Sequence, residues 1–240
     1  SLSGGMVAHY RLDDAKGLRT ANAVDEKPGA SYKGPGEPQW VPGVMGRALA
    51  LDGQGAHVDC GTVFDPERTD KFSYGCWFNA ATNDQTACLL SKIGALFDGS
   101  GQGGFHAILR DDSLQLGWIH RFPENRLTLT VEFDHENDRW HHLAVSYDGT
   151  AKGAGVKVFV DGQLASSRIA VDTLTESIRN TAPVQIGQQQ LHSSFHGRID
   201  DVRIWDRELD AAEALALYEL GVRAVARLAA DQRTPDQQEL

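Results

Sequence analysis

Three carboxylates at every second position are the clearest candidates for acid–base chemistry in this chain. Glu132, Asp134 and Glu136 stand at i, i+2 and i+4, so on a β-strand they would project from one face. Carboxylates that face each other can divide the roles of proton donor and proton acceptor. However, residues 134–138 (DHEND) directly precede a strand-like segment that begins at Trp140. A charge cluster in that place is typical of a solvated turn, which is the interpretation we favour.

A second group with chemical potential lies at the end of one predicted strand, beside Phe122 and a turn at Pro123. An aromatic face can stack on the C–H groups of a sugar, while Arg and His side chains supply hydrogen bonds. We expect two residues of the preceding strand to lie nearby. The predicted ligand-binding set is Trp118, His120, Arg121, His106 and Arg110. The alternative is that Trp118, which alternates with Leu114 and Leu116, belongs to the core.

The elements that position these side chains are predicted to be β-strands. Between residues 6 and 207, apolar side chains recur mostly at every second position, and the 25 glycines of the chain supply turns between short segments. Asp148-Gly149 and Asp161-Gly162 each predict a strand reversal. No helical period lies between the strands, so we predict an all-β fold, a two-sheet antiparallel β-sandwich of the jelly-roll kind. The expected strands are 7–12, 48–51, 56–60, 72–78, 87–92, 105–110, 113–119, 126–133, 141–147, 156–160, 184–186 and 197–205.

Past Trp205 the period changes to that of a short C-terminal helix. Asp210 is a suitable N-cap and Gly221 a suitable stop signal. We therefore predict one domain over residues 1–221. Residues 222–240, which become polar toward the end, are predicted to form a helical or disordered tail or linker, as in a piece of a larger multidomain chain.

Composition narrows the function classes. With 23 Lys and Arg against 33 Asp and Glu, the formal charge is -10, which argues against a nucleic-acid partner. The chain holds no run of apolar residues long enough to span a membrane. Its cysteines form no CxxC motif, so no zinc site is indicated. Cys76 and Cys88 flank a predicted hairpin, and both a disulfide and two free thiols remain open.

Several motifs, in order, resemble the laminin G-like, concanavalin A-like jelly-roll domains. Residues 139–149 (RWHHLAVSYDG) and 156–162 (VKVFVDG) are similar to the central strand pair of that family. Residues 195–205 (FHGRIDDVRIW), with the helix that follows, look like its closing motif. The early strands and the opening are represented by residues 46–53, 72–78 and 7–25. The resemblance implies an antiparallel sandwich used mostly for recognition of carbohydrate or protein.

The resemblance also implies two kinds of site. The ExDxE spacing is similar to the catalytic strand of β-glucanases with this fold, in which Glu132 would be the nucleophile, Glu136 the acid/base and Asp134 a tuning residue of a retaining pair. Related domains often hold structural Ca²⁺ through carboxylate and carbonyl oxygens. By position, the expected calcium ligands are Asp25, Asp52 and Asp200. Each aspartate also has an ordinary role, as a loop cap, a turn residue or an arginine partner.

Together these observations predict a non-catalytic recognition module of an exported, periplasmic or cell-surface protein, bacterial by resemblance, with carbohydrate as the leading ligand class and protein as the second. The alternatives are a retaining β-glucan hydrolase that uses Glu132 and Glu136, and a protein-binding or spacer domain.

Overall fold

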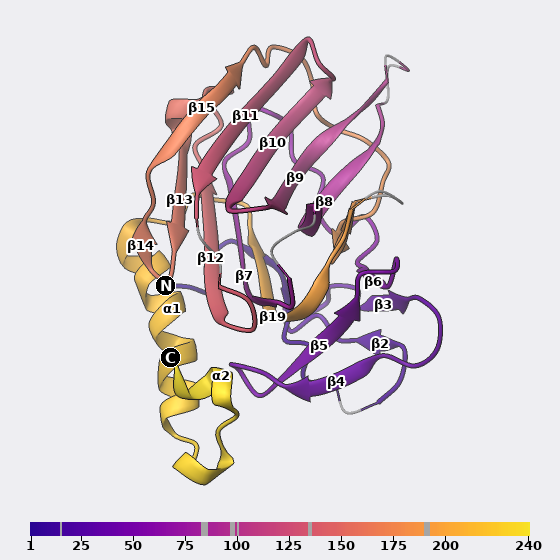
Figure 1. Cartoon of the computed structure of the whole chain (residues 1–240). Helices are drawn as coiled ribbons and strands as arrows, with labels where there is room; N and C mark the ends of the chain where they lie inside the picture. Colours follow the sequence, from indigo (N-terminus) through magenta and orange to yellow (C-terminus); the bar gives the residue numbers. More distant parts are fainter. Residues whose placement is uncertain (15, 83–85, 97–98, 100, 134–135, 190–192) are drawn as a thin grey trace.

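The computed structural model of the chain consists of two large sheets packed face to face, with a helix on the outside of one of them (Figure 1). The structure describes residues 1–240 except 15, 83–85, 97–98, 100, 134–135 and 190–192. The strand pairings within the described residues are antiparallel. The predicted all-β sandwich with a C-terminal helix is therefore confirmed.

The first sheet has eight strands in the order β14-β13-β12-β7-β19-β5-β4, with β1 also paired to β19. Its central strands are β7 and β12, which are buried on both faces because the core lies on one side and helix α1 on the other. Its members are β1 (Met6–Tyr10), β4 (Gln39–Pro42), β5 (Arg47–Asp52), β7 (Phe72–Ala80), β12 (Trp140–Tyr147), β13 (Val156–Val160), β14 (Gln163–Leu164) and β19 (His196–Trp205).

The second sheet has nine strands in the order β15-β11-β10-β9-β8-β16-β6-β3-β2. A short hairpin, β17 (Gln188–Gln189) with β18 (Ser193–Ser194), lies against β8. The members of the second sheet are β2 (Arg19–Thr20), β3 (Ala30–Lys33), β6 (His57–Asp59), β8 (Thr86–Ala95), β9 (Gln102–Arg110), β10 (Ser113–Arg121), β11 (Asn125–Glu132), β15 (Ser167–Asp172) and β16 (Gln185–Ile186).

An aromatic cluster fills the space between the two sheets. Phe72 lies 5.2 Å from Phe105 and 6.2 Å from Trp118, measured between ring centroids, so the rings bridge β7 with β9 and β10. Trp118 also lies 5.1 Å from Tyr147 of β12. These rings alternate with outward-facing side chains along each strand, which is the pattern that the sequence predicted. The core thus lies between the two sheets and does not cover the outer face of the second sheet.

The turn signals of the sequence are confirmed, with one difference. Asp161 and Gly162 take positive φ angles of 50° and 75° in the two-residue turn between β13 and β14. Asp148-Gly149 also reverses the chain, but it opens a longer connection that contains a short 3-10 helix, η1 (Gly153–Gly155). Strands β3, β4 and β15 were not expected, because they are short or exposed edge strands whose side chains show no clear alternation.

Helix α1 (Ala211–Ala226) covers the outer face of the first sheet. As predicted, Asp210 caps it, in a reciprocal pair of hydrogen bonds with Glu213. The predicted stop at Gly221 is wrong, because the helix continues through this residue to Ala226. A Cβ at position 221 would lie 2.4 Å from the Trp77 ring. Gly221 therefore allows a close approach between helix and sheet.

The segment after α1, predicted to be helical or disordered, is partly helical and packs on the first sheet. It forms the 3-10 helix η2 (Ala230–Gln232) and the short helix α2 (Pro235–Gln238), which return to the first sheet. Arg198 of β19 donates to Asp236 at 2.9 Å, and Gln237 donates from Nε2 to the Gly43 carbonyl at 2.6 Å. The predicted boundary at residue 221 therefore divides a segment that packs as part of the same structure.

Two further expectations bear on the chain as a whole. Cys60, Cys76 and Cys88 are buried and free, so the open question about Cys76 and Cys88 resolves to thiols. Among the described residues, no helix combines the length and apolar character that a membrane crossing requires.

Candidate functional site

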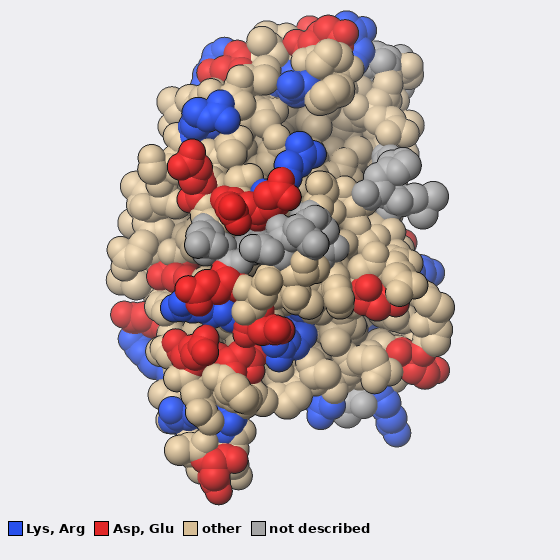
Figure 2. Space-filling view, viewed as in Figure 1, with Lys and Arg blue, Asp and Glu red and all other residues tan. Residues whose placement is uncertain are grey.

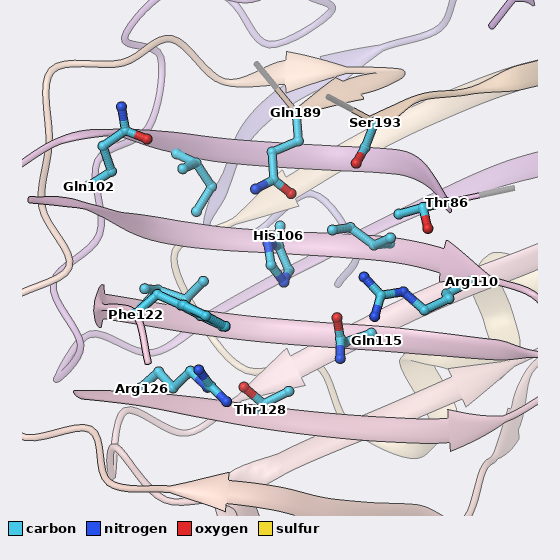
Figure 3. A pocket seen from close by; sticks show the side chains of 13 residues that line it. Thr86, Gln102, His106, Arg110, Gln115, Phe122, Arg126, Thr128, Gln189 and Ser193 are labelled. Atoms are coloured by element: carbon cyan, nitrogen blue, oxygen red, sulfur yellow. The ribbon is translucent and has the colours of Figure 1, made fainter. Parts of the chain in front are cut away.

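A groove of about 390 Å³ lies on the outer face of strands β8–β11, beside the β17–β18 hairpin. Figure 3 shows its side chains rising from neighbouring strands toward a common space. Figure 2 shows mostly uncharged side chains over the middle of these strands, with acidic and basic side chains toward their ends. The residues that define its character are His106, Arg110, Gln115, Phe122, Arg126 and Gln189.

His106 lies at the centre of the groove. It is paired across the sheet with Gly117 of β10, and a Cβ on Gly117 would stand 2.5 Å from His106 Nε2. The missing side chain thus gives the imidazole room to lie over β10. Burial lowers the pKa of His106 to about 4, and the charge of Arg110 acts in the same direction, whereas Gln189 opposes it. The ring is neutral at physiological pH, and its Nδ1 is buried without a hydrogen-bond partner.

An exposed aromatic ring forms one end of the groove. Phe122, which follows β10, has 69% of its surface exposed. The guanidinium of Arg126, on the adjacent strand β11, lies 4.2 Å from the ring centroid, which restricts the orientation of the ring through a cation–π contact. A large ring that is exposed yet held in place can serve as a flat stacking surface for a ligand.

Polar side chains border the rest of the groove. Arg110, at the end of β9, turns back over the sheet toward Gln115 (Figure 3). Gln189 and Ser193, from the β17–β18 hairpin, form the opposite wall. The hairpin is anchored to the sheet by Ser91 of β8, whose hydroxyl donates to the Gln188 carbonyl at 2.7 Å. The groove therefore offers amide, hydroxyl and guanidinium groups around an apolar platform.

The structure brings together only part of the predicted ligand-binding set. His106 and Arg110 line the groove, on the same face of β9. Trp118 is 0% exposed and lies in the core, so the alternative interpretation of that residue is correct and the ring is not a ligand surface. His120 is buried and its Nδ1 lies 2.7 Å from the Ser177 carbonyl, whereas Arg121 is exposed and pairs with Glu124 at 3.6 Å.

On β10 the sequence analysis selected Trp118, whereas the residues that line the groove lie on the opposite face of that strand. Side chains alternate along a strand, so a core position for Trp118 puts Gln115 and Ile119 on the outer face with Gly117. Arg126 and Thr128 of β11 follow by the same rule, because Leu127 and Leu129 lie in the core. Gln189 and Ser193 carried no sequence signal, since their hairpin is defined only by its packing on β8.

Glu132 and Glu136 of the predicted carboxylate row do not lie on one strand. Strand β11 ends at Glu132, and Glu136 lies beyond it at a turn, exposed and paired with Arg139 at 3.2 Å. Asp134 lies outside the described residues. The turn interpretation is thus confirmed for Glu136, and the geometry expected for a retaining pair, with both glutamates on one strand, is not present.

The three expected calcium ligands do not form a common cage. Asp25 and Asp52 are exposed, and Asp52 accepts a hydrogen bond from the Gln54 backbone N–H. Asp200 is fully buried and accepts from the Met45 N–H at 2.8 Å, and burial, with the charge of Asp201, raises its pKa. Across the described part of the chain, no group of three or more His, Cys, Asp or Glu side chains is arranged to hold a metal. Calcium binding remains a prediction based on the resemblance.

Comparison with known families supports the architecture. A laminin G family model, described as the concanavalin A-like lectin/glucanases superfamily, matches residues 52–214. The resemblance seen in the sequence is therefore confirmed. No curated protein matches the chain.

Solved structures with the same fold include binding domains of bacterial toxins. The binding domain of Paraclostridial mosquitocidal protein 1 superposes with a TM-score of 0.68 at 14% identity, over 92% of this chain and 53% of that one. The binding domain of botulinum neurotoxin serotype G gives a TM-score of 0.67 at 13% identity, over 90% and 51% of the two chains. The chain thus spans about half the length of these toxin domains.

A further structural relative is similar in size. Domain 4 of AbnA, an extracellular arabinanase of Geobacillus stearothermophilus, was solved in complex with arabinotriose. It superposes with a TM-score of 0.59 at 17% identity, over 89% of this chain and 98% of that one. At these identities the three likenesses show the fold alone, and the site must be judged from its own residues.

Proposed function

Because the chain belongs to the concanavalin A-like lectin/glucanases superfamily, we propose that it is a non-catalytic recognition module and that the groove over β8–β11 binds a carbohydrate chain. The fold by itself does not select a ligand. The proposal depends on the side chains that the outer face of the second sheet presents.

Phe122 is the observation that carries the proposal. Its ring is 69% exposed at the end of the groove, so it is accessible to a ligand there. Its ring, held against Arg126 at 4.2 Å, offers a flat apolar surface to the C–H face of a sugar. Gln115, Thr128 and Ser193 border the same space with groups that can both donate and accept hydrogen bonds to hydroxyls.

The relatives support a binding role without defining the ligand. The toxin domains are described as binding domains, and the arabinanase domain was solved with a trisaccharide. We further propose that this chain acts outside the cytoplasm, as part of a larger exported, periplasmic or cell-surface protein, as the arabinanase that contains domain 4 is extracellular. A protein ligand is the second candidate from the same comparison.

The proposal is tested by screening a glycan array and measuring the affinity of the best oligosaccharide by calorimetry. Phe122→Ala should weaken binding by about tenfold or more, since loss of a stacking contact costs roughly 1–1.5 kcal/mol. Leu164→Ala is the matched control, because Leu164 is 65% exposed and belongs to the opposite sheet. Absence of glycan binding, or binding that Phe122→Ala leaves unchanged, would overturn the proposal.

The hydrolase alternative is tested in the same preparation. Release of reducing ends from β-glucans by the wild type, abolished in Glu132→Gln, would replace the recognition role with catalysis. Since Glu136 pairs with Arg139 at a turn, we expect no such release.

A further inference from the structure

The groove over β8–β11 differs in charge from the chain that contains it. The protein has a formal charge of -10, yet the described lining residues include Arg110 and Arg126 and no Asp or Glu. Resting on the proposed function, we propose that the saccharide carries anionic groups, carboxylate or sulfate, and that Arg110 and Arg126 bind them. Guanidinium groups form strong, charge-assisted hydrogen bonds with such oxyanions.

Arg126 provides the first line of support. Its Nε and Nη1 atoms are buried and find no hydrogen-bond acceptor in the described structure. Its nearest described partner is the Phe122 ring, which attracts the cation but accepts no strong hydrogen bond. A half-buried cation with unused donors is costly in the free protein, and an oxyanion in the groove would relieve that cost.

Arg110 provides the second. Its side chain turns inward over the sheet toward Gln115 and His106 (Figure 3), close enough for its charge to disfavour protonation of His106. The carboxylates of Asp111 and Asp112 follow it in the chain, but neither forms an ion pair with Arg110 within the described residues. The positive charge is therefore directed into the groove without a described counter-charge.

Two arginines of β19, in the first sheet, show the contrast. Arg198 pairs with Asp236 at 2.9 Å, and Arg203 pairs with Asp201 at 2.9 Å. Each of those two guanidinium groups thus has a carboxylate partner within the fold. Among the residues that the structure describes, no carboxylate pairs with Arg110 or Arg126, which is the arrangement expected when the acid comes from the ligand.

The charge state of His106 bears on how binding should depend on pH. Since the His106 pKa lies at about 4, the ring is uncharged above about pH 6 and adds no charge to the groove. The attraction for an anion then comes from arginines, which remain protonated throughout. Affinity for a fully ionised oligosaccharide should be constant between pH 6 and 9 and should fall as salt concentration rises.

The experiment compares three oligosaccharides of equal length by calorimetry: a polyuronate oligomer, the same oligomer with methyl-esterified carboxylates, and a sulfated neutral oligomer. We expect the polyuronate or the sulfated oligomer to bind at least about tenfold more tightly than the ester. Preference between these two distinguishes carboxylate from sulfate, and either result supports the proposal. Arg110→Gln and Arg126→Gln should each reduce the preference about tenfold.

Arg223→Gln is the matched control, because it removes the same charge from α1, on the opposite sheet. Equal weakening by Arg223→Gln would show a general charge effect and would overturn the inference. Equal binding of all three oligosaccharides would also overturn the inference, and if Phe122→Ala still weakened that binding, the proposed function would stand. Absence of binding by every oligosaccharide would remove the proposed function itself.

If Arg126→Gln fails to fold, as judged by circular dichroism, Arg110→Gln with Arg110→Lys decides the case, because lysine restores charge but not the planar fork.

Discussion

The imidazole of His106 on β9 occupies the space that the absent side chain of Gly117 leaves on β10, its partner across the sheet. A methyl group there would stand 2.5 Å from Nε2, well inside van der Waals contact. The two residues therefore form one structural unit at the centre of the groove, in which a glycine determines where a neutral histidine lies.

The first prediction concerns this unit. Gly117→Ala should displace the ring into the groove, weaken oligosaccharide binding and lower the free energy of unfolding by about 1–3 kcal/mol. In the double variant with His106→Ala the clash is gone, so the two costs should not add. Urea unfolding of the four proteins measures the coupling. Strictly additive costs would show that the two side chains do not compete for space.

The second prediction concerns acid stability. Burial lowers the pKa of both His106 and His142 to about 4, below the value of about 6.5 in an unfolded chain. Between these values the unfolded chain binds more protons, so this stability is complete above pH 6.5 and is lost as pH falls toward 4. Asp200 acts in the opposite direction, because burial raises its pKa and the native carboxyl keeps its proton to higher pH.

Unfolding by urea at pH 7 and at pH 4.5 checks this expectation. His142→Gln should reduce the difference between the two pH values by on the order of 2 kcal/mol. His196→Gln, at an exposed position of β19, is the control. An unchanged difference in His142→Gln would mean that His142 titrates alike in the folded and unfolded chain.

The third prediction concerns a buried lysine beneath the hairpin side of the second sheet. Lys92 is 1% exposed and donates from Nζ to the Asn180 carbonyl at 2.7 Å and the Ala182 carbonyl at 3.0 Å, and it pairs with Asp65 at 3.1 Å. Lys92→Met leaves these acceptors unpaired and should cost about 3–5 kcal/mol of unfolding free energy. Arg179→Gln removes the other, 52% exposed partner of Asp65 and should cost at most about 1 kcal/mol. Equal costs in denaturant unfolding would contradict a special role for the buried cation.

The fourth prediction concerns the C-terminal segment. Deleting residues 228–240 removes Asp236 from Arg198 and Gln237 from the Gly43 carbonyl. Stability should fall by at least about 1.5–3 kcal/mol, the range for a hydrogen bond to a charged group. Oligosaccharide affinity should not change, because this segment packs on the first sheet and the groove lies on the second. A truncated protein of unaltered melting temperature would support the predicted loose tail instead.

The fifth prediction concerns calcium, which the family resemblance implies. An ion bound by the native state alone stabilises it by mass action, so a chelator should lower the unfolding midpoint and added CaCl₂ should restore it. If Asp200 is a ligand, Asp200→Asn should abolish this difference. The same midpoint in calcium and in chelator would contradict the expectation, in agreement with the absence of a carboxylate cage among the described residues.

The strands of most of the sandwich could be predicted from local sequence patterns. Alternation of apolar side chains is a local property, so it located strands such as β9, β10 and β12. For Trp118, which was predicted to bind ligand, it offered a core position beside Leu114 and Leu116 as the alternative, and that alternative is correct. Capping by Asp210 and the turn at Asp161-Gly162 are also local, because each depends on a few neighbouring residues.

The composition of the groove depends on how the strands are ordered in space. Phe122, Arg126 and Gln189 come from different strands and a separate hairpin, and they meet because the order β11-β10-β9-β8 places those strands side by side. Alternation of apolar and polar residues distinguishes the two faces of a strand, but it does not show which side chains of other strands contact each face. The role of Gly117 beside His106 and the burial of Lys92 therefore could not be predicted. In the same way, Gly221 is a stop signal in sequence and a point of close packing in space, because Trp77 lies against it.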